Sequence, residues 1–508
     1  MNLSNFWVNF FYLNSEFITL YFILSLLWVY LLKIFLTIFG FKIKKDDLHY
    51  LIFILIVTIL YFLFFISFKY LGFIVNYIPV YFFNNLFINV QFINLVKYIM
   101  WCLLIFYFIF LLQYHKIFKL PIFEYIILIL TSFLSLQLII ISNNLFFIFL
   151  CIELVNLCIY TLLGLSNDLH KNIECAYKYF IQSSYATIIG IFGLSLIYMS
   201  SGTLMINELS LLLNNNFYNI SFITQIGLIF IVLSIFFKLG LIPAHIWIGD
   251  IYQGSNLATL LFIATIPKIA YCTLFFNLFI HFWFYIQNIS LILSFITIIY
   301  GSILALYQTN FQRMIGYGSM SHMGLVIYTI SIGINTGYSA AAFFYLFFYV
   351  FLIFFLLSFI YFINEKDSFN FLYHTNNISQ IGIILYKNKI LTIILASIFF
   401  SLAGLPFFVG FISKWYIFLN LVKDYKIIEL FILLFLSVLS SAYYIRLIRF
   451  LFFMDSKNFK ITYFNNLNID KDDLFIFFLL FIFLFNIFII FFHATLYAYI
   501  FKLIFYLI

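Results

Sequence analysis

Charge is what this chain has least of. Only 8% of its 508 residues are Asp, Glu, Lys or Arg, whereas 66% are hydrophobic. Apolar runs of about 18 residues or more, long enough to cross a bilayer as a helix, recur from end to end. A buried core helix explains one short apolar run but not their repetition. The composition therefore excludes a soluble domain and predicts an all-α polytopic membrane protein.

Cysteine is also rare, and its placement excludes two kinds of site. The five cysteines stand singly, without the spacing of a metal site or of a disulfide framework. The sequence also lacks the paired histidines typical of haem and the Gly-rich turn typical of dinucleotide binding. We therefore expect no metal and no cofactor in this chain, and we expect the cysteines to be packing residues.

Proline and glycine are scarce, with 5 and 19 residues, against 77 Phe and 39 Tyr. This usage, with abundant Ile and Asn, is typical of an AT-rich genome such as many mitochondrial DNAs. The first apolar run is long enough to span and lacks the features of a cleavable signal peptide. We expect a multi-pass protein of the mitochondrial inner membrane, with the plasma membrane of a low-GC bacterium as the alternative.

Hydropathy predicts about fourteen spans. Segment 71–92 is the weakest candidate, because Asn76, Pro79, Asn84 and Asn85 favour an interfacial stretch. The predicted spans are Ile18–Phe39, Leu48–Phe68, Ile93–Leu112, Pro121–Ile141, Asn144–Leu165, Ile173–Ser200, Ile223–Leu241, Asn256–Ile280, Ile289–Tyr307, Ile315–Ile332, Tyr338–Ile363, Leu391–Leu421, Ile427–Leu451 and Leu474–Phe492.

Lysine and arginine gather in the loops that follow odd-numbered spans. Under the positive-inside rule these loops face the matrix or cytoplasm, and both termini lie on the opposite side. The formal net charge of +8 therefore reflects topology, and we expect no nucleic-acid partner. The loops on the other side carry only Lys69, Lys97, Lys423, Lys426 and Lys502.

The chain has no linker and is predicted to be one membrane domain with an internal repeat. FFKLGLIP (Phe236–Pro243) matches FFSLAGLP (Phe399–Pro406) at four positions, in the seventh and twelfth spans. Spans five apart run in opposite directions, and inverted repeats with broken helices are typical of transporters. The predicted boundaries are N-terminal helices at 1–120, a first repeat at 121–280, a second inverted repeat at 289–451 and a C-terminal region at 452–508.

Four ionisable residues lie inside the predicted spans. Glu153, Lys238, Lys268 and Lys414 interrupt runs of Phe, Ile and Leu. A charge at the bilayer centre costs about 2.5–3.5 kcal/mol, so such residues usually face a bundle interior and mark ion or proton pathways. Burial disfavours the charged lysine, so a neighbouring charge then decides whether it holds a proton. The alternative is a side chain that reaches from a helix end to water.

Lys178 follows Glu174 by one helical turn near the start of the sixth span. Residues four apart on a helix are neighbours, so an ordinary surface ion pair is one interpretation. The other is that Lys178 couples Glu153 to Lys238.

Two histidines and one pair of loop charges complete the set. His245 follows Pro243, where we expect the seventh helix to break. The imidazole of His322 is suited to relay protons, although a lone histidine among small residues is also typical of hydrogen-bonded packing. We interpret Arg313 and Asp250 as structural residues at the loop ends of their spans.

Six segments together carry a family resemblance between Leu145 and Phe450. In chain order they are IELVNLCIYTLLG, NIECAYKYF, FFKLGLIPAHIWIGDIYQG, FIATIPKIA, ALYQTNFQRMIGYGSMSHMG and SLAGLPFFVGFISKWYIF. They closely resemble the antiporter-like membrane subunits of respiratory complex I, the proton-pumping NADH:ubiquinone oxidoreductase, and subunit 2 among them. The lysine at Lys414 favours subunit 2, because subunit 4 would have a glutamate there. Gly249 departs from the proline usual in the family at this position after the seventh helix.

The resemblance implies fourteen helices with two inverted five-helix repeats and broken seventh and twelfth helices. It assigns the proton path to Glu153, Lys238, Lys268 and Lys414, with the three residues Lys178, His245 and His322 in less central places. It implies an enzyme subunit without a redox centre of its own, whose partners are other membrane-arm subunits and phospholipids and whose only small substrate is the proton. A Na⁺/H⁺ antiporter subunit and a purely structural membrane-arm subunit are the alternatives.

Overall fold

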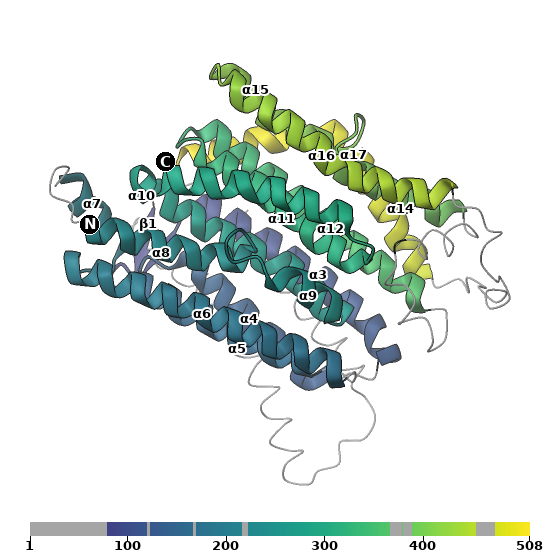
Figure 1. The fold of residues 1–508 in the computed structure, drawn as a ribbon, viewed down its shortest axis with the longest axis horizontal. Coiled ribbons are helices and arrows are strands. Elements are labelled where there is room, and N and C mark those ends of the chain that lie inside the picture. Colours follow the sequence, from purple (N-terminus) through teal and green to yellow (C-terminus); the bar gives the residue numbers. More distant parts are fainter. Residues whose placement is uncertain are drawn as a thin grey trace, which may run out of the picture. The chain divides into compact units, whose positions relative to one another are not determined.

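The computed structural model describes residues 79–118, 122–165, 169–215, 222–365, 378, 389–453 and 473–507. In these ranges the chain is almost entirely helical (Figure 1), and eight helices are long and apolar enough to cross a membrane. The predicted all-α polytopic architecture is confirmed. The first two predicted spans lie outside the described residues, whereas the third to the fourteenth fall on described helices.

The helices follow the predicted spans closely, because long apolar runs form helices that satisfy their own backbone. Their bounds are α3 (Gln91–Phe118), α4 (Ile122–Ile141), α5 (Leu145–Gly164), α6 (Leu169–Ser201), α7 (Ile206–Asn215), α8 (Phe222–Leu239), α9 (Trp247–Gly254), α10 (Leu257–Tyr307), α11 (Phe311–Ser331), α12 (Thr336–Glu365), α14 (Lys389–Ala403), α15 (Val409–Lys423), α16 (Ile427–Phe453) and α17 (Asp473–Phe505).

Two compact units make up the chain. The first comprises the described residues up to Ser234 together with Ile266–His281, and the second comprises Ile235–Thr265 and the described residues of Phe282–Tyr506. Helix α10 contributes to both. It covers the predicted eighth and ninth spans without a gap, and the non-helical φ of −128° at Phe282 marks their junction.

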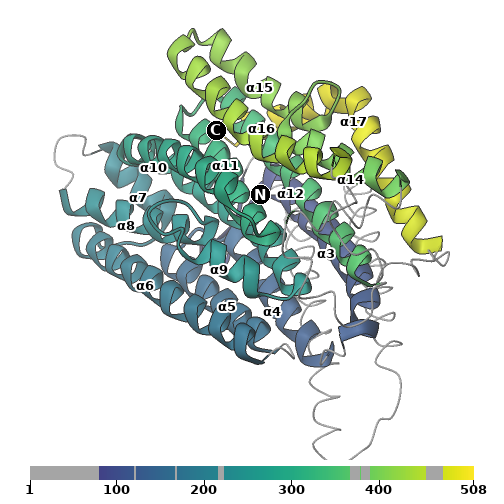
Figure 2. The same cartoon turned by 45° about the vertical axis from the view of Figure 1, so that its right-hand side comes forward.

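In the first unit, α4 packs along α5 and α5 along α6 (Figure 2). An antiparallel hairpin precedes α3, with strands β1 (Val80–Phe82) and β2 (Phe87–Asn89). The hairpin confirms that the described part of segment 71–92 is not a span, and it is a small exception to the all-α prediction. Asn143 ties it to two later loops, because its N–H donates to Leu86 and its carbonyl accepts from Ile206.

In the second unit, α12 is the central helix. It packs against α11, α14, α15 and α17, and 94% of its apolar membrane-crossing stretch is buried inside the protein. A helix that is apolar on all sides is stable only when neighbours surround it. The run from Ala340 to Leu357 is of this kind, because nearly all of its residues are buried.

Contacts between loops agree with the predicted sidedness. Arg446, near the end of the thirteenth span, donates to the carbonyls of Leu306 and Gln308 at the end of the ninth. On the other side, Lys426 donates to Ile332, so loops after the twelfth and tenth spans meet. Odd loops contact odd loops and even contact even, as the charge distribution predicts.

Candidate proton path

The seventh span breaks at a glycine. Helix α8 ends at Leu239, and Gly240 takes a positive φ of 73°. The N–H of Gly240 donates to Phe237 and that of Leu241 to Phe236, the two bonds of a Schellman motif. The predicted break is present and Pro243 lies within it, between α8 and α9, but the residue that ends the helix is Gly240, three residues earlier. Gly240 ends the helix because it adopts the left-handed conformation without steric cost. Pro243 comes after the helix has already ended.

Lys238 lies in the last turn of α8, where the sequence placed it. Its side chain is buried, with 6% exposed, and its Nζ lies 5.0 Å from the centre of the Phe237 ring. The indole Nε1 of Trp247, the first residue of α9, donates to the Phe237 carbonyl at 2.9 Å. A cation is favoured at a helix C-terminus, where the backbone carbonyls point outward. The break therefore offers Lys238 a partly polar site inside an apolar span.

His245 lies between the two half-helices and is half-buried. Its Nδ1 is 3.2 Å from the Pro243 carbonyl, and its ring packs edge-on against Tyr300 at 4.9 Å. This position after the break is the one predicted from sequence.

The twelfth span breaks in the same way. Helix α14 ends at Ala403, Gly404 takes a φ of 82°, and Gly404 and Leu405 donate to Ser401 and Phe400 as in a Schellman motif. Lys414 on α15 is 4% exposed, and its Nζ donates to the Ala403 carbonyl at 3.1 Å. The lysine thus lies at the C-terminal end of α14, across the break from its own helix.

The two breaks correct the internal match found in the sequence. Matching the Phe–Phe pairs aligns Gly240 with Ala403. The backbone instead aligns Gly240 with Gly404, one residue further, because both fill the left-handed position of the motif. The local geometry is shared. The inverted relation between the two repeats stays a prediction.

Glu153 and Lys268 belong to the first unit. Glu153 is half-buried on α5 and accepts a hydrogen bond of 3.4 Å from Asn156, one turn on, as the spacing predicted. Lys268 follows Pro267 within α10 and is 3% exposed. A snorkelling position is therefore excluded for Lys268.

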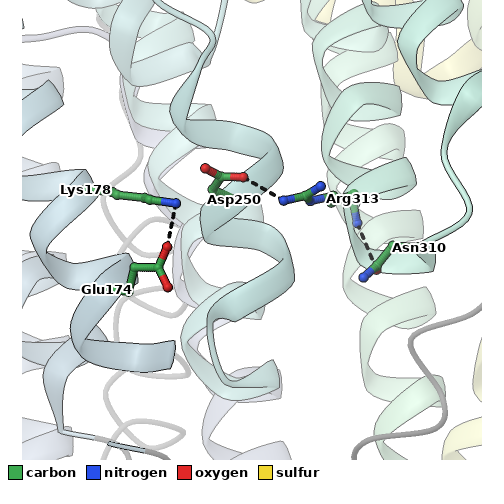
Figure 3. A network of polar contacts seen from close by, with 5 residues as sticks. All are labelled: Glu174, Lys178, Asp250, Asn310 and Arg313. Atoms are coloured by element: carbon green, nitrogen blue, oxygen red, sulfur yellow. Dashed lines mark hydrogen bonds and ion pairs between the residues drawn. The ribbon is translucent and has the colours of Figure 1, made fainter. Parts of the chain in front are cut away.

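Lys178 forms the ion pair that its spacing allows. Its Nζ lies 2.7 Å from Oε1 of Glu174, and both side chains are substantially exposed (Figure 3). The role of Lys178 as a link to Glu153 stays a prediction. Arg313 binds Asp250 at 2.8 Å, and Asn310 caps α11 by accepting from the Arg313 N–H (Figure 3). The structural interpretation of Arg313 and Asp250 agrees with this geometry.

His322 is buried on α11, with 3% exposed, among aromatic side chains of α12 and α16. Its Nδ1 lies 2.5 Å from the Tyr345 hydroxyl and its Nε2 lies 2.9 Å from the Tyr444 hydroxyl. Tyr349 stacks on the imidazole with ring centres 4.8 Å apart. The sequence predicted a relay or hydrogen-bonded packing, and the ring is hydrogen-bonded on both nitrogens.

Sequence reasoning missed two features. Lys97 was assigned to a loop, but it lies inside α3 and is 2% exposed. The signal was present, since Lys97 interrupts an apolar run just as Lys238 does. Trp247 was passed over because an indole donor to a helix end has no sequence pattern.

Within the described ranges, no group of three His, Cys, Asp or Glu side chains is placed to hold a metal ion. The cysteines are free thiols, buried except for the half-buried Cys102. The chemistry that these residues offer is the binding and release of protons by amines, a carboxylate, imidazoles and phenols.

Comparisons with known proteins point to one family. Subunit N of the NADH-quinone oxidoreductase of Pelagibacter ubique (strain HTCC1062) is 32% identical over 352 residues, which are 68% of this chain and 72% of that protein. A chain of the membrane-bound sulfane sulfur reductase, an archaeal respiratory membrane complex, aligns with a TM-score of 0.78 at 20% identity over 95% of this chain and 96% of its own. A chain of respiratory complex I from Thermus thermophilus gives 0.64 at 20% identity, over 85% and 90%.

The family model described as "NADH:quinone oxidoreductase/Mrp antiporter, TM" matches residues 142–440, more than half of the chain. The matched region holds both helix breaks, His322 and the four ionisable residues that the sequence singled out, Glu153, Lys238, Lys268 and Lys414. The chain belongs to the NADH:quinone oxidoreductase/Mrp antiporter membrane family.

Proposed function

We propose that this chain is subunit 2 of respiratory complex I, the counterpart of bacterial subunit N, and that it carries protons across the membrane. One observation carries the proposal: the three lysines predicted from sequence to lie on the proton path are buried. Lys238, Lys268 and Lys414 are 6%, 3% and 4% exposed. Such residues are costly inside a bilayer, and those that occur there usually mark an ion or proton pathway.

The energies fit electrostatic switching. Moving one charge against a membrane potential costs about 2.3 kcal/mol per 100 mV. A neighbouring charge at about 4 Å is worth about 4 kcal/mol at an effective dielectric constant of 20. Redox work elsewhere in the complex that changes the charge beside one lysine therefore suffices to make it take up or release a proton. Glu153 is the carboxylate that would exchange charge with the lysines, and Lys178, His245 and His322 are secondary groups.

The surroundings that we propose are other membrane-arm subunits and phospholipids. Helices α6 and α16 expose apolar faces, which include Phe180, Ile188, Phe192, Phe431 and Phe435. Apolar surface of this extent requires lipid or a partner helix to cover it. We place the protein in the mitochondrial inner membrane on the strength of its composition. The bacterial plasma membrane is the alternative, and the Pelagibacter relative is bacterial.

The test is proton pumping by the assembled complex carrying Lys238→Ala, in sealed vesicles driven by NADH. We expect pumping to be lost while the complex still assembles. The matched control is Lys423→Ala, because Lys423 is exposed at the end of α15 and should tolerate the change.

Two other results would replace the proposal. Unchanged pumping in Lys238→Ala would favour a structural subunit that only completes the membrane arm. Sodium-dependent proton exchange by the chain without NADH oxidation would favour the antiporter subunit.

A further inference from the structure

The proposed function leaves the phenols around His322 without a role. Tyr345, Tyr443 and Tyr444 come from helices α12 and α16 and are 3%, 0% and 2% exposed. A buried phenol usually needs only one hydrogen-bond partner. Here the hydroxyls of Tyr345 and Tyr444 both converge on one imidazole, from opposite nitrogens.

The cluster extends beyond the imidazole on one side. The Tyr443 hydroxyl lies 3.5 Å from Nε2 of His322 and 3.2 Å from the Oγ of Ser321, which itself donates to Gly318. The rings of Tyr443 and Tyr444 are packed at 4.3 Å between centres. Five hydrogen-bonding side chains therefore form a continuous series from Tyr345 through His322 to Ser321.

The hydrogen-bond chemistry of imidazole gives this series a direction. A neutral imidazole has one N–H donor and one acceptor nitrogen. With a phenol on each nitrogen, one phenol must accept from the ring while the other donates to it. Tyr349 packs against the ring, tilted by 34°, with ring centres 4.8 Å apart.

We infer that Tyr345, His322 and Tyr444 form a proton wire from α12 through α11 to α16, with phenol hydroxyls in the place of bridging waters. This inference rests on the proposed proton translocation and adds tyrosines to it.

The step balances without an oxidant or reductant. A proton reaching the Tyr345 oxygen releases the hydroxyl proton of Tyr345 to Nδ1 of His322. The Nε2 proton then passes to the Tyr444 oxygen as the Tyr444 hydroxyl proton leaves toward Tyr443. One proton enters and one leaves, and no bond other than O–H and N–H is made or broken. The imidazole is left with its proton on Nδ1, so the ring and the hydroxyls must reorient before the next proton passes in the same direction.

The experiment measures NADH-driven proton pumping in sealed vesicles by the assembled complex carrying Tyr345→Phe or Tyr444→Phe. Each change removes one hydroxyl and keeps the ring. We expect loss of pumping while NADH oxidation with an artificial acceptor, which bypasses the quinone, is retained. Tyr349→Phe is the matched control, because Tyr349 contacts the imidazole by stacking and should pump normally.

A second variant separates conduction from packing. Glutamine in His322→Gln has one amide donor and one carbonyl acceptor, so it still binds a phenol on each side but cannot pass a proton between them. The wire predicts that the complex assembles and does not pump. Normal pumping by His322→Gln would overturn the inference, as would normal pumping by both Tyr→Phe variants.

Lys414→Ala, measured in parallel, keeps the two proposals apart. If it pumps normally, the proposed function itself fails. If it does not pump while both Tyr→Phe variants do, the function stands and the phenol wire is wrong.

Discussion

The two helix breaks end in the same backbone motif but are held together differently. In both, a glycine with φ of 73° or 82° closes a Schellman motif, and a lysine lies close to the exposed carbonyls. At the first break, the bond across the gap comes from the indole of Trp247 to Phe237. At the second, it comes from Lys414 to Ala403. The titratable lysine itself makes the bond across the second break, whereas an indole makes the bond across the first.

Packing across the gap also differs. The second residue of α9 is Ile248, whose side chain fills the space beside Gly240. The second residue of α15 is Gly410, where a Cβ would lie 1.6 Å from the Ser401 carbonyl oxygen. Side chains therefore fill the first break, whereas backbone touches backbone at the second. A proton that enters or leaves Lys414 therefore acts on the closure of its own break.

The largest expected effect is at this backbone contact. Gly410→Ala places a methyl group where only hydrogen fits, and the two half-helices must separate. We expect destabilisation of about 4–5 kcal/mol, in the range of exceptional single substitutions. The amount of assembled complex on a native gel should fall sharply.

The control is Gly164→Ala, at the end of α5, where an added Cβ meets nothing within 4 Å. It should assemble normally. If Gly410→Ala also assembles normally, the second break is looser than this contact implies and the contrast with the first is lost.

The sequence predicted the helices well and their breaks less well. Apolar runs determine where a helix crosses a bilayer, so α4, α5 and α12 begin and end near their predicted bounds. Each break depends on a single residue in the left-handed conformation. The prolines and the alignment of the two Phe–Phe pairs predicted the breaks at positions one to three residues away from it. Helix α7 and the β1–β2 hairpin are short, and short elements leave little periodic signal.

The candidate site, too, was predicted only in part. Lys238, Lys268 and Lys414 were predicted because a charge in an apolar run is conspicuous without any partner. The tyrosines around His322 were not, because they lie 23 and 122 residues away in the chain and look like ordinary aromatic residues of a span. Partners of this kind follow from tertiary packing, which a single sequence does not show.

An intermediate effect should distinguish the bond from Trp247 across the first break from the bond from Lys414 across the second. Trp247→Phe keeps a ring and removes one donor to Phe237, at a cost of about 0.5–1.5 kcal/mol. The substitution leaves Lys238 in place, so we expect proton pumping to continue. The assembled complex should become less resistant to mild heating. Lys414→Met removes donor and charge together, so pumping should stop.

The measurements are the rate of NADH-driven acidification and the fraction of complex that survives a heating step. Loss of pumping in Trp247→Phe, with assembly intact, would mean that the indole also positions Lys238 through Phe237. The two breaks would then both link closure to their lysine, and the contrast between them would disappear.

The smallest effect concerns the outer part of the first break. Asp250 of α9 binds Arg313 of α11, with side chains 37% and 40% exposed. Exposed ion pairs are worth about 0–1 kcal/mol and weaken with salt, because water and ions screen them. Asp250→Asn should therefore change heat resistance slightly at low salt, not at all at high salt, and leave pumping unchanged. A large loss at both salt concentrations would show that α9 is held mainly by this pair rather than by Trp247 and Ile248, and the first break would then depend on a charge just as the second does.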